Sequence, residues 1–427
     1  MSDTTTPHEL DAETLRTLLD AAGSPGYETW WAMTRSAGFC THPIRLTRTG
    51  AEGHTTVFAR CENRRANVCP SCSDLYAADT WHLVAGGLDD DHLNGSAAVF
   101  ATLTAPSFGT VHTLRADENG TPRPCHSHLH RATVCPHGRP QHCTLTHRPG
   151  DLTLGRPLCP ACYDYASHAL TTWWFPQLWH RFTIQLRRQI RAEHSAVRVS
   201  FVKVMELQTR LAPHYHTIIR ADAPDGGGTV AAETLASVVQ AAAARVHLDV
   251  PAPAGPLRLR FGPECDAQPI TGSSTAGRAA GYLAKYVTKN ITDAPLPRRI
   301  PKTNIGLLPV SDHHKQIMHS LADLAEALPD HYAGMADHLP SLGWRGHTTT
   351  KSRAYSTTMG QQKAIRTAWR AGHRDDAADD AQPGEEWQYD GSGHRTPGQR
   401  YLALSAALAH REQLWALRQL PDLQDQR

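Results

Sequence analysis

The pattern of apolar and polar positions predicts an ordered series of strands and helices in the central part of the chain. β-Branched and aromatic residues gather in four segments that are expected to form strands, at residues 96–106, 196–208, 214–220 and 257–270, the last a strand pair. Helices are predicted at residues 162–194, 230–248 and 279–290. The first of these contains Pro176, so it is expected to be either one interrupted helix or two helices.

The order of these elements indicates the fold class. They follow one another as strand, helix, two strands, helix, strand and helix, which is typical of an antiparallel sheet with helices on one face. The predicted class is therefore α+β. Residues 107–160 are rich in histidine, proline, glycine and cysteine, which predicts an inserted loop region held together by metal. A last helix is predicted at residues 401–420.

The net charge of the chain is close to zero, at +2, but the charged residues are unevenly distributed. Residues 339–374 contain no aspartate or glutamate and seven lysines or arginines, among them Arg345, Lys351 and Arg353. This stretch is either a phosphate-binding surface, and hence a DNA contact, or an ordinary charged surface. The acidic run that begins at Asp375 is expected to be a solvated linker.

Hydropathy gives an expectation for the cellular compartment. The N-terminus has no apolar segment of signal-peptide length, and no run of the chain approaches membrane-spanning length. The protein is therefore expected to be cytoplasmic, with no membrane partner. In that compartment its ten cysteines are expected to be thiols rather than disulfides.

Two Cys-Pro-x-Cys units predict two structural zinc sites. Such a turn lets two thiolates reach one ion, and two further ligands must come from elsewhere. The first site is predicted from Cys40, Cys61, Cys69 and Cys72. The second is predicted from Cys135, Cys159 and Cys162 with either Cys143 or His147. That second set stays open, because three more candidates lie close in the sequence: Cys125, His137 and His142.

These zinc ions are expected to hold loops together rather than to catalyse a reaction, because full sets of thiolate ligands leave no open coordination position. The alternative is a thioredoxin-type redox pair, but no βαβ pattern follows either unit. Cys265 is left over and is expected to be a small buried residue.

Two histidines, His214 and His216, lie one residue apart at the start of a predicted strand. Alternate residues of a strand point to the same face, so these imidazoles either hold a metal ion together or are separately solvated. One register of the hairpin pairs Glu206 with His216, which adds a carboxylate to that face. Gln208 would then lie opposite His214. In this register Glu206 is a third candidate ligand.

Two stripes run along the predicted helix at residues 279–290. The aliphatic stripe, which is expected to face the core, consists of Ala280, Leu283, Ala284 and Val287. The other stripe consists of Tyr282, Lys285, Tyr286 and Lys289. Since the aliphatic stripe already supplies the core contact, the two phenols are interpreted as nucleophiles among phosphate-binding ammonium groups. Nearby cations would favour the phenolate form of a tyrosine, whose pKa is ordinarily about 10.

Three segments, in this order, resemble the motifs of the HUH endonucleases. They are FATLTAP at 100–106, Glu206 with HYH at 214–216, and YLAKYVTK at 282–289. The set is most similar to the rolling-circle replication initiators of plasmids and single-stranded phages. Three further segments resemble the RepSA-type initiators of actinomycete plasmids: CENRRANVCPSC at 61–72, LCPACYDY at 158–165 and GHTTTKSRAYSTT at 346–358.

The resemblance implies a metal-dependent DNA nickase and strand transferase that starts plasmid replication. In this family the two histidines and an acid, here His214, His216 and Glu206, hold one Mg²⁺ or Mn²⁺. A tyrosine attacks the scissile phosphate, which leaves a 5′-phosphotyrosyl enzyme and a free 3′-OH that primes synthesis. A second nucleophile ends the round by religation.

The resemblance also implies individual residue roles. The YxxKY form of the motif places nucleophiles at both Tyr282 and Tyr286. In the one-tyrosine form of the family only the second of these positions is a tyrosine, so Tyr286 is preferred as the first nucleophile and Tyr282 as the next, while Lys285 and Lys289 would hold the phosphate. The first motif, with Thr102 and Thr104, is implied to be mainly structural. The implied partners are plasmid origin DNA, single-stranded or extruded at the nick site, and the host replication helicase and polymerase.

The expected organisation has four parts. They are an N-terminal zinc-binding region at 1–95, an HUH nuclease domain at 96–292 with a zinc-binding insertion at about 115–165, a basic DNA-contacting region at 293–374, and an acidic linker with a terminal helix at 375–427. The main alternative function is a non-enzymatic zinc-ribbon DNA-binding regulator. It explains the cysteines and the basic stretch, but it gives no reason for the tyrosine stripe or the histidine pair.

Overall fold

The computed structural model describes residues 11–50, 53–89, 96–126, 134–223, 229–287, 296–372 and 387–419. These residues form two compact units. The first holds the described parts of 1–82 and 358–427, and the second holds those of 83–287 and 291–357. This division differs from the sequence-based one, because the two ends of the chain share one unit instead of forming separate regions. The acidic linker predicted from Asp375 lies almost entirely outside the described residues.

The first unit combines elements from both ends of the chain. β1 (Ile44–Gly50) and β2 (Gly53–Ala59) form a hairpin, and β12 (Gln388–Ser392) pairs antiparallel with β1. The predicted terminal helix forms as α11 (Pro397–Gln419) and packs against α1 (Ala12–Ala22). The other described helices of the first unit are α2 (Tyr27–Ser36), α10 (Met359–Gly372) and most of α3 (Pro70–Ala85).

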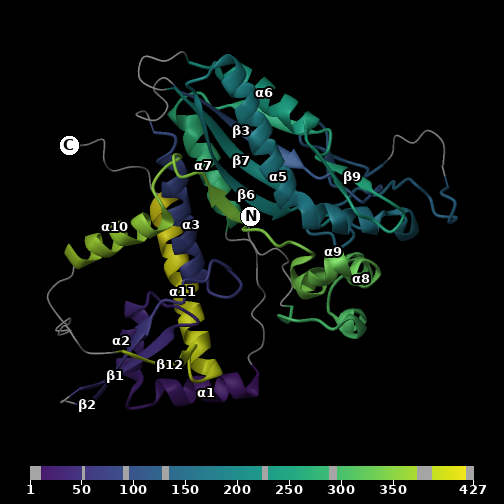
Figure 1. Ribbon diagram of the computed structural model, residues 1–427. Helices are drawn as coiled ribbons and strands as arrows, with labels where there is room; N and C mark the ends of the chain where they lie inside the picture. The colour runs from purple at the N-terminus through teal and green to yellow at the C-terminus, as the bar shows by residue number, and fades with distance from the viewer. Residues whose placement is uncertain are drawn as a thin grey trace. The chain divides into compact units, whose positions relative to one another are not determined.

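The second unit is organised around a five-stranded antiparallel sheet with the strand order β10-β3-β7-β6-β11 (Figure 1). In that order the strands are Cys265–Pro269, Ala97–Thr104, Pro213–Asp222, Arg198–Leu207 and Thr349–Lys351. β6 and β7 form a long hairpin, which places β7 in the middle of the sheet. The segment at 257–270 is two strands, as predicted, but β9 (Leu257–Arg260) pairs with β8 (His247–Val250) rather than with β10.

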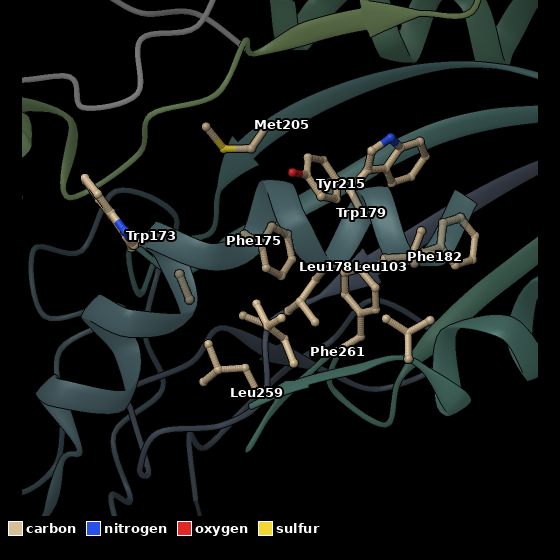
Figure 2. Close-up of a cluster of buried hydrophobic side chains, with 14 of the residues drawn as sticks. Leu103, Trp173, Phe175, Leu178, Trp179, Phe182, Met205, Tyr215, Leu259 and Phe261 are labelled. Carbon is tan, nitrogen blue, oxygen red and sulfur yellow. The ribbon is translucent and has the colours of Figure 1, made fainter. Parts of the chain in front are cut away.

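One face of this sheet carries the main hydrophobic core. Tyr215, Leu103 and Ile219 point to this face and are almost fully buried there. α5 (Tyr165–Glu193) covers them: the Phe175 ring stacks on Tyr215 with ring centroids 4.8 Å apart, and Trp179 lies 5.2 Å from the same ring (Figure 2). α6 (Ala232–Arg245) covers the β3 and β10 end of the same face. Each large side chain buried here contributes about 2 kcal/mol of hydrophobic stabilisation.

Helices cover both faces of the sheet, so the prediction of helices on one face only is wrong. α7 (Ser273–Val287) lies against β6 and β7 on the opposite face, where Phe100 and His216 contact its Tyr282. The reason is the central position of β7, because residues 213–221 are buried on both faces of that strand. A strand whose side chains are buried on both faces of a sheet needs a covering layer on each face, and helices supply both layers here.

α5 is a single helix of 29 residues that continues through Pro176. Proline removes one backbone hydrogen bond from a helix, but burial of the adjacent turns holds this one together. Trp173 and Trp179 on this helix are both buried, so they belong to the core of the unit.

Short elements complete the second unit. α8 (Asp312–Ala327) packs against α5. Three short elements pack in turn against α8: α9 (Pro329–Tyr332) and the 3₁₀ helices η2 (Lys302–Leu307) and η3 (Ala333–Ser341). The insertion between β3 and α5 contains only β4 (Arg115–Ala116), β5 (Pro122–Arg123) and the 3₁₀ turn η1 (Pro160–Cys162) among its described residues. Within the described part of the chain, no helix has both the length and the apolar character needed to cross a bilayer.

Candidate active site

The β6–β7 hairpin brings one carboxylate and two imidazoles to the same face of the sheet. Glu206 lies directly opposite His214, and Val204 lies opposite His216. This register is two residues away from the expected one, in which Glu206 faced His216. A shift by two residues keeps every side chain on its own face, so the three predicted ligands still converge.

Gln208 does not join this group, because it belongs to the turn between the two strands. Its backbone N–H donates to the Ala212 carbonyl, and its side-chain oxygen accepts from Arg210 Nε at 2.8 Å. Leu211 in this turn has a φ of 64°, a left-handed conformation that residues other than glycine adopt infrequently. Such a turn needs support from the residues around it.

Three side chains that the sequence analysis did not identify hold this turn, and hence the start of β7. Arg210 donates two hydrogen bonds, each 2.8 Å long, to backbone carbonyls that follow β3. His168 of α5 lies 3.1 Å from the Leu211 carbonyl, and His313 of α8 lies 3.0 Å from the Arg210 carbonyl. Full burial lowers the pKa of His168 to about 3, which keeps this ring neutral. Isolated histidines in a sequence carry no signal for such a role.

The ligand atoms of the acidic and imidazole groups are close enough to share one ion. His214 Nε2 and His216 Nε2 are 2.7 Å apart, and Glu206 Oε2 lies 3.5 and 3.6 Å from them. Both histidines are buried, with 6% and 5% of their surface exposed. Two imidazole nitrogens at this separation repel each other unless a proton or a cation lies between them. The pair can therefore share a proton in an N–H···N hydrogen bond or bind a cation together with Glu206, and two imidazoles and a carboxylate fit Mg²⁺, Mn²⁺ or Zn²⁺.

A threonine from the neighbouring strand orients one of these imidazoles. Thr102 Oγ1 lies 3.2 Å from His216 Nδ1. When Nδ1–H donates to this hydroxyl, the Nε2 lone pair points to the metal position. Thr102 thus contacts a candidate ligand directly, whereas Thr104 Oγ1 donates to the Glu264 carbonyl at 3.1 Å and has a structural role.

α7 presents its two stripes as the sequence predicts. The aliphatic stripe is buried at Ala280, Leu283, Ala284 and Val287. On the other stripe, the ring centroids of Tyr282 and Tyr286 lie 4.9 and 5.2 Å from that of His216 and 4.6 Å from each other. Tyr282 is 40% exposed and Tyr286 is half-buried. Both phenols therefore lie beside the candidate metal site.

The electrostatic surroundings of the tyrosines differ from the expected ones. Burial, a hydrogen bond with Tyr286 and the charge of Glu206 raise the pKa of Tyr282, whereas the sequence analysis expected cations to favour its phenolate. Lys285 is exposed, with its Nζ 5.9 Å from the Tyr286 ring centroid. Lys289 lies outside the described residues.

The four N-terminal cysteines, Cys40, Cys61, Cys69 and Cys72, come together as the sequence predicts. The Cys40 sulfur lies 3.7 Å from the sulfurs of Cys69 and Cys72. Zinc–sulfur bonds of about 2.3 Å in a tetrahedron place two sulfurs about 3.8 Å apart. The geometry of this group therefore fits one zinc ion.

The described part of the insertion contains two groups of residues that could each hold a metal ion, rather than the single group that the sequence predicts. The first is His112, Cys125, Cys143 and His147, and the second is Cys135, His137, Cys159 and Cys162. The expected set is corrected in its fourth ligand, because Cys143 and His147 lie in the other group and His137 takes their place. His112 is a further candidate ligand that the sequence does not predict, because it belongs to no Cys-x-x-Cys unit. With the N-terminal cysteines, the described residues hold three Cys/His groups instead of two.

The basic residues predicted to contact DNA have different surroundings. The Arg345 guanidinium lies over the rings of Trp173 and Trp174 and donates to the Trp173 carbonyl at 3.1 Å. Lys351, in β11, donates to two nearby carbonyls at 3.2 and 2.8 Å. Arg353 is exposed. The first two side chains thus have structural contacts, and Arg353 is the most available of the three.

Comparison with known proteins places these residues in context. A family model described as "RepSA: Replication initiator protein, pSAM2" matches residues 26–408. A curated relative from Streptomyces ambofaciens, "Replication initiator protein", is 36% identical over 453 residues, which cover 93% of this chain and 94% of the relative. The comparison with solved structures gives no match.

Proposed function

The chain belongs to the RepSA family of replication initiator proteins, and from this premise we propose that it starts plasmid replication by nicking one strand of the origin DNA. In this proposal the five-stranded sheet of the second unit is an HUH endonuclease core. One observation carries it: the rings of Tyr282 and Tyr286 lie against His216, which shares a sheet face with His214 and Glu206. A possible nucleophile and a possible metal site thus lie side by side.

His214, His216 and Glu206 would hold a Mg²⁺ or Mn²⁺ ion. Their three ligand atoms lie within 4.8 Å of one another, a spacing that suits one divalent ion. When bound, the ion polarises the scissile phosphate and offsets the negative charge that develops during attack. If His216 Nδ1–H donates to Thr102 Oγ1, 3.2 Å away, the His216 Nε2 lone pair is the one that would bind the ion.

The nicking step exchanges one phosphoester bond for another. The phenol oxygen of Tyr286 forms a bond to phosphorus, and the bond from phosphorus to the 3′ oxygen breaks. The phenol loses one proton and the departing oxygen gains one, so the enzyme keeps a 5′-phosphotyrosyl link and releases a free 3′-OH. Tyr282 acts in the second transfer, which religates the strand. Lys285 and Lys289 supply positive charge to the phosphate oxygens.

The released 3′-OH defines the partners of the reaction. It must be extended by a DNA polymerase, and the duplex ahead of it must be opened by a helicase, so both host enzymes would act beside this protein. The origin strand would enter single-stranded or extruded, because the tyrosines need access to its backbone. Arg353, with Arg345 and Lys351, would contact the phosphates.

Covalent trapping tests the proposal. The protein is incubated with Mn²⁺ and labelled single-stranded DNA from the origin of its own replicon, and a labelled protein band is sought after denaturation. The variants are Tyr286→Phe, Tyr282→Phe and His216→Ala. Tyr401→Phe is the matched control, because Tyr401 is 38% exposed, close to the value for Tyr282, and lies in the other unit.

The expected result is a band that disappears in Tyr286→Phe and His216→Ala and persists in the control. Loss of the band only in Tyr282→Phe would keep the chemistry and reverse the order of the nucleophiles. If no origin fragment gives a band while the protein still binds origin duplex, the nickase is refuted, and a zinc-dependent DNA-binding regulator remains.

A further inference from the structure

The described part of the insertion between β3 and α5 contains eight cysteine and histidine residues in two groups that could each hold a metal ion. The group that begins with His112 continues with Cys125, Cys143 and His147. The group that begins with Cys135 continues with His137, Cys159 and Cys162. Within each group the ligand atoms lie within 4.8 Å of one another.

The first group has the geometry of a tetrahedral zinc site. Such a site separates two nitrogens by about 3.3 Å and a nitrogen from a sulfur by about 3.6 Å. The observed distances are 3.2 Å from His112 Nδ1 to His147 Nε2 and 3.6 Å from His147 Nε2 to the Cys143 sulfur. The remote nitrogen of His147, Nδ1, lies 2.7 Å from an Asp151 carboxylate oxygen. A carboxylate on the far side of a histidine ring is the usual support for a zinc ligand.

The second group presents its ligands from two tight turns. The Gly138 N–H donates to the Cys135 carbonyl, and the Cys162 N–H donates to the Cys159 carbonyl. His137 Nδ1 lies between the turns, 3.2, 3.8 and 4.0 Å from the sulfurs of Cys162, Cys159 and Cys135. These distances bracket the value of about 3.6 Å for a nitrogen and a sulfur on one zinc ion.

The described part of the insertion has few other contacts that could hold its shape. Among described residues 113–126 and 134–154, the buried ones are Cys125, Cys135, Cys143 and His147, and every one of them is a ligand. The apolar side chains of Leu114, Val134, Leu145 and Leu152 are exposed. A segment without an apolar core needs covalent or metal links to fold.

The order of the ligands along the chain shows how the two groups are connected. They occur as four successive pairs: His112 with Cys125, Cys135 with His137, Cys143 with His147, and Cys159 with Cys162. The first and third pairs form one group, and the second and fourth pairs form the other. We infer that the insertion binds two zinc ions through these interleaved pairs, as a cross-braced module. Together with the N-terminal cysteines, the chain then holds three thiolate-bound zinc ions.

The base of this module adjoins the hairpin turn that precedes His214. The two ends of the insertion pair with each other, with hydrogen bonds from the His112 N–H to the Arg156 carbonyl and from the Gly155 N–H to the His112 carbonyl. Gly155 has a φ of 79°, and a Cβ there would lie 2.2 Å from the Thr209 carbonyl oxygen. The module therefore packs directly against the β6–β7 turn. By holding the module together, its zinc ions would also stabilise the residues that contact this turn.

Cadmium-113 NMR tests the inference, because ¹¹³Cd²⁺ replaces zinc at thiolate sites and its resonance moves downfield with each added sulfur ligand. The full-length protein should give three thiolate-ligated resonances: four-sulfur, three-sulfur and two-sulfur. A cadmium ion at the Glu206 site has no sulfur ligand and resonates apart from them. The measurement does not involve DNA, so its failure is distinguishable from failure of the proposed nickase.

Ligand swaps distinguish interleaved from sequential pairing. Sequential pairing, with His112, Cys125, Cys135 and His137 on one ion, would also give one two-sulfur and one three-sulfur site. If the pairs interleave, Cys135→His should shift the three-sulfur resonance into the two-sulfur range. If the pairs are sequential, the same variant should shift the two-sulfur resonance into the one-sulfur range and leave the three-sulfur resonance in place. Cys143→His should give the converse pattern. Both variants keep a metal ligand, so the module retains its ions.

The control is Cys265→Ser, which should leave all three resonances unchanged, because Cys265 belongs to none of the groups. Two thiolate-ligated resonances in the full-length protein would overturn the inference, because one group of the insertion would then hold no ion. The sequential pattern of ligand swaps would overturn it equally.

Discussion

Acidification should weaken the protein through His168, the buried histidine that supports the turn before β7. The ring is fully buried; its Nε2 lies 3.1 Å from the Leu211 carbonyl, and its Nδ1 lies 2.9 Å from the Tyr163 hydroxyl. A neutral ring that donates from Nε2 and accepts at Nδ1 satisfies both contacts. Burial, assisted by the neighbouring His313, lowers the pKa of His168 from 6.5 to about 3.

The size of the effect follows from the difference in pKa between the folded and unfolded chains. Because the folded value is the lower one, the unfolded chain takes up the proton first as the pH falls. Above about pH 6.5 both states are neutral, and His168 adds no pH dependence. Between about pH 6.5 and 3 its share of the free energy of unfolding falls by about 1.4 kcal/mol per pH unit. From pH 7 to pH 5 the loss is therefore about 2 kcal/mol.

The assay compares the wild type with His168→Gln, whose side chain keeps a donor and an acceptor but does not titrate. Urea unfolding at about pH 7 and pH 5, followed by tryptophan fluorescence, measures the free energy of unfolding of each protein. Effects of other groups, including the zinc ligands, cancel in the difference between the two proteins. The free energy of unfolding of the wild type minus that of His168→Gln should fall by about 2 kcal/mol from pH 7 to pH 5. Equal losses in both proteins would refute the assignment of the low pKa to His168.

Three further predictions concern the site and its supports. Glu206→Gln removes the charge that faces both imidazoles, so Mn²⁺ binding measured by calorimetry should weaken by about tenfold or more; unchanged binding would exclude Glu206 as a ligand. Gly155→Ala brings a Cβ against the Thr209 carbonyl and should lower the free energy of unfolding by about 2 kcal/mol more than Gly150→Ala, which shares the left-handed φ but meets no atom within 4 Å. Lys203→Met should raise the free energy of unfolding near neutral pH, because burial lowers the pKa of Lys203 to about 7 and the unfolded chain holds its proton up to about pH 10.5. That gain should shrink by about 2 kcal/mol between pH 7.5 and 9.5 in paired denaturation curves, and a constant gain would contradict the low pKa.

The residues of the candidate site could be recognised from the sequence because their spacing reflects local geometry. A period of two on a strand places His214 and His216 on one face, whatever the strand pairs with. A helical period separates the aliphatic stripe of α7 from Tyr282 and Tyr286 in the same way. The CxxC turn brings Cys69 and Cys72 together locally, and the structure confirms that Cys40 and Cys61 join them.

The pairing of residues far apart in the chain is harder to predict from the sequence. The hairpin register differs by two residues from the expected one, because the left-handed turn at Leu211 takes Gln208 out of the strand. Glu206 still lies on the same face as the two histidines, as predicted, because a two-residue shift preserves the face of a strand. The covering of both sheet faces depends on the central place of β7, which hydrophobic alternation in a single segment does not reveal.

The sequence by itself determined which candidate functional residues share a local element: two histidines and an acid on neighbouring strands, two tyrosines on one helix stripe, and enough cysteines and histidines for zinc. These are consequences of residue type and of periods of two and 3.6 residues. Only the tertiary structure decided which of these groups meet. It brings Thr102 to His216, places His168 and His313 under the turn, and sorts the ligands of the insertion into two interleaved groups. Such contacts join residues far apart in the chain, and their partners are chosen by the packing of the whole unit rather than by any local pattern.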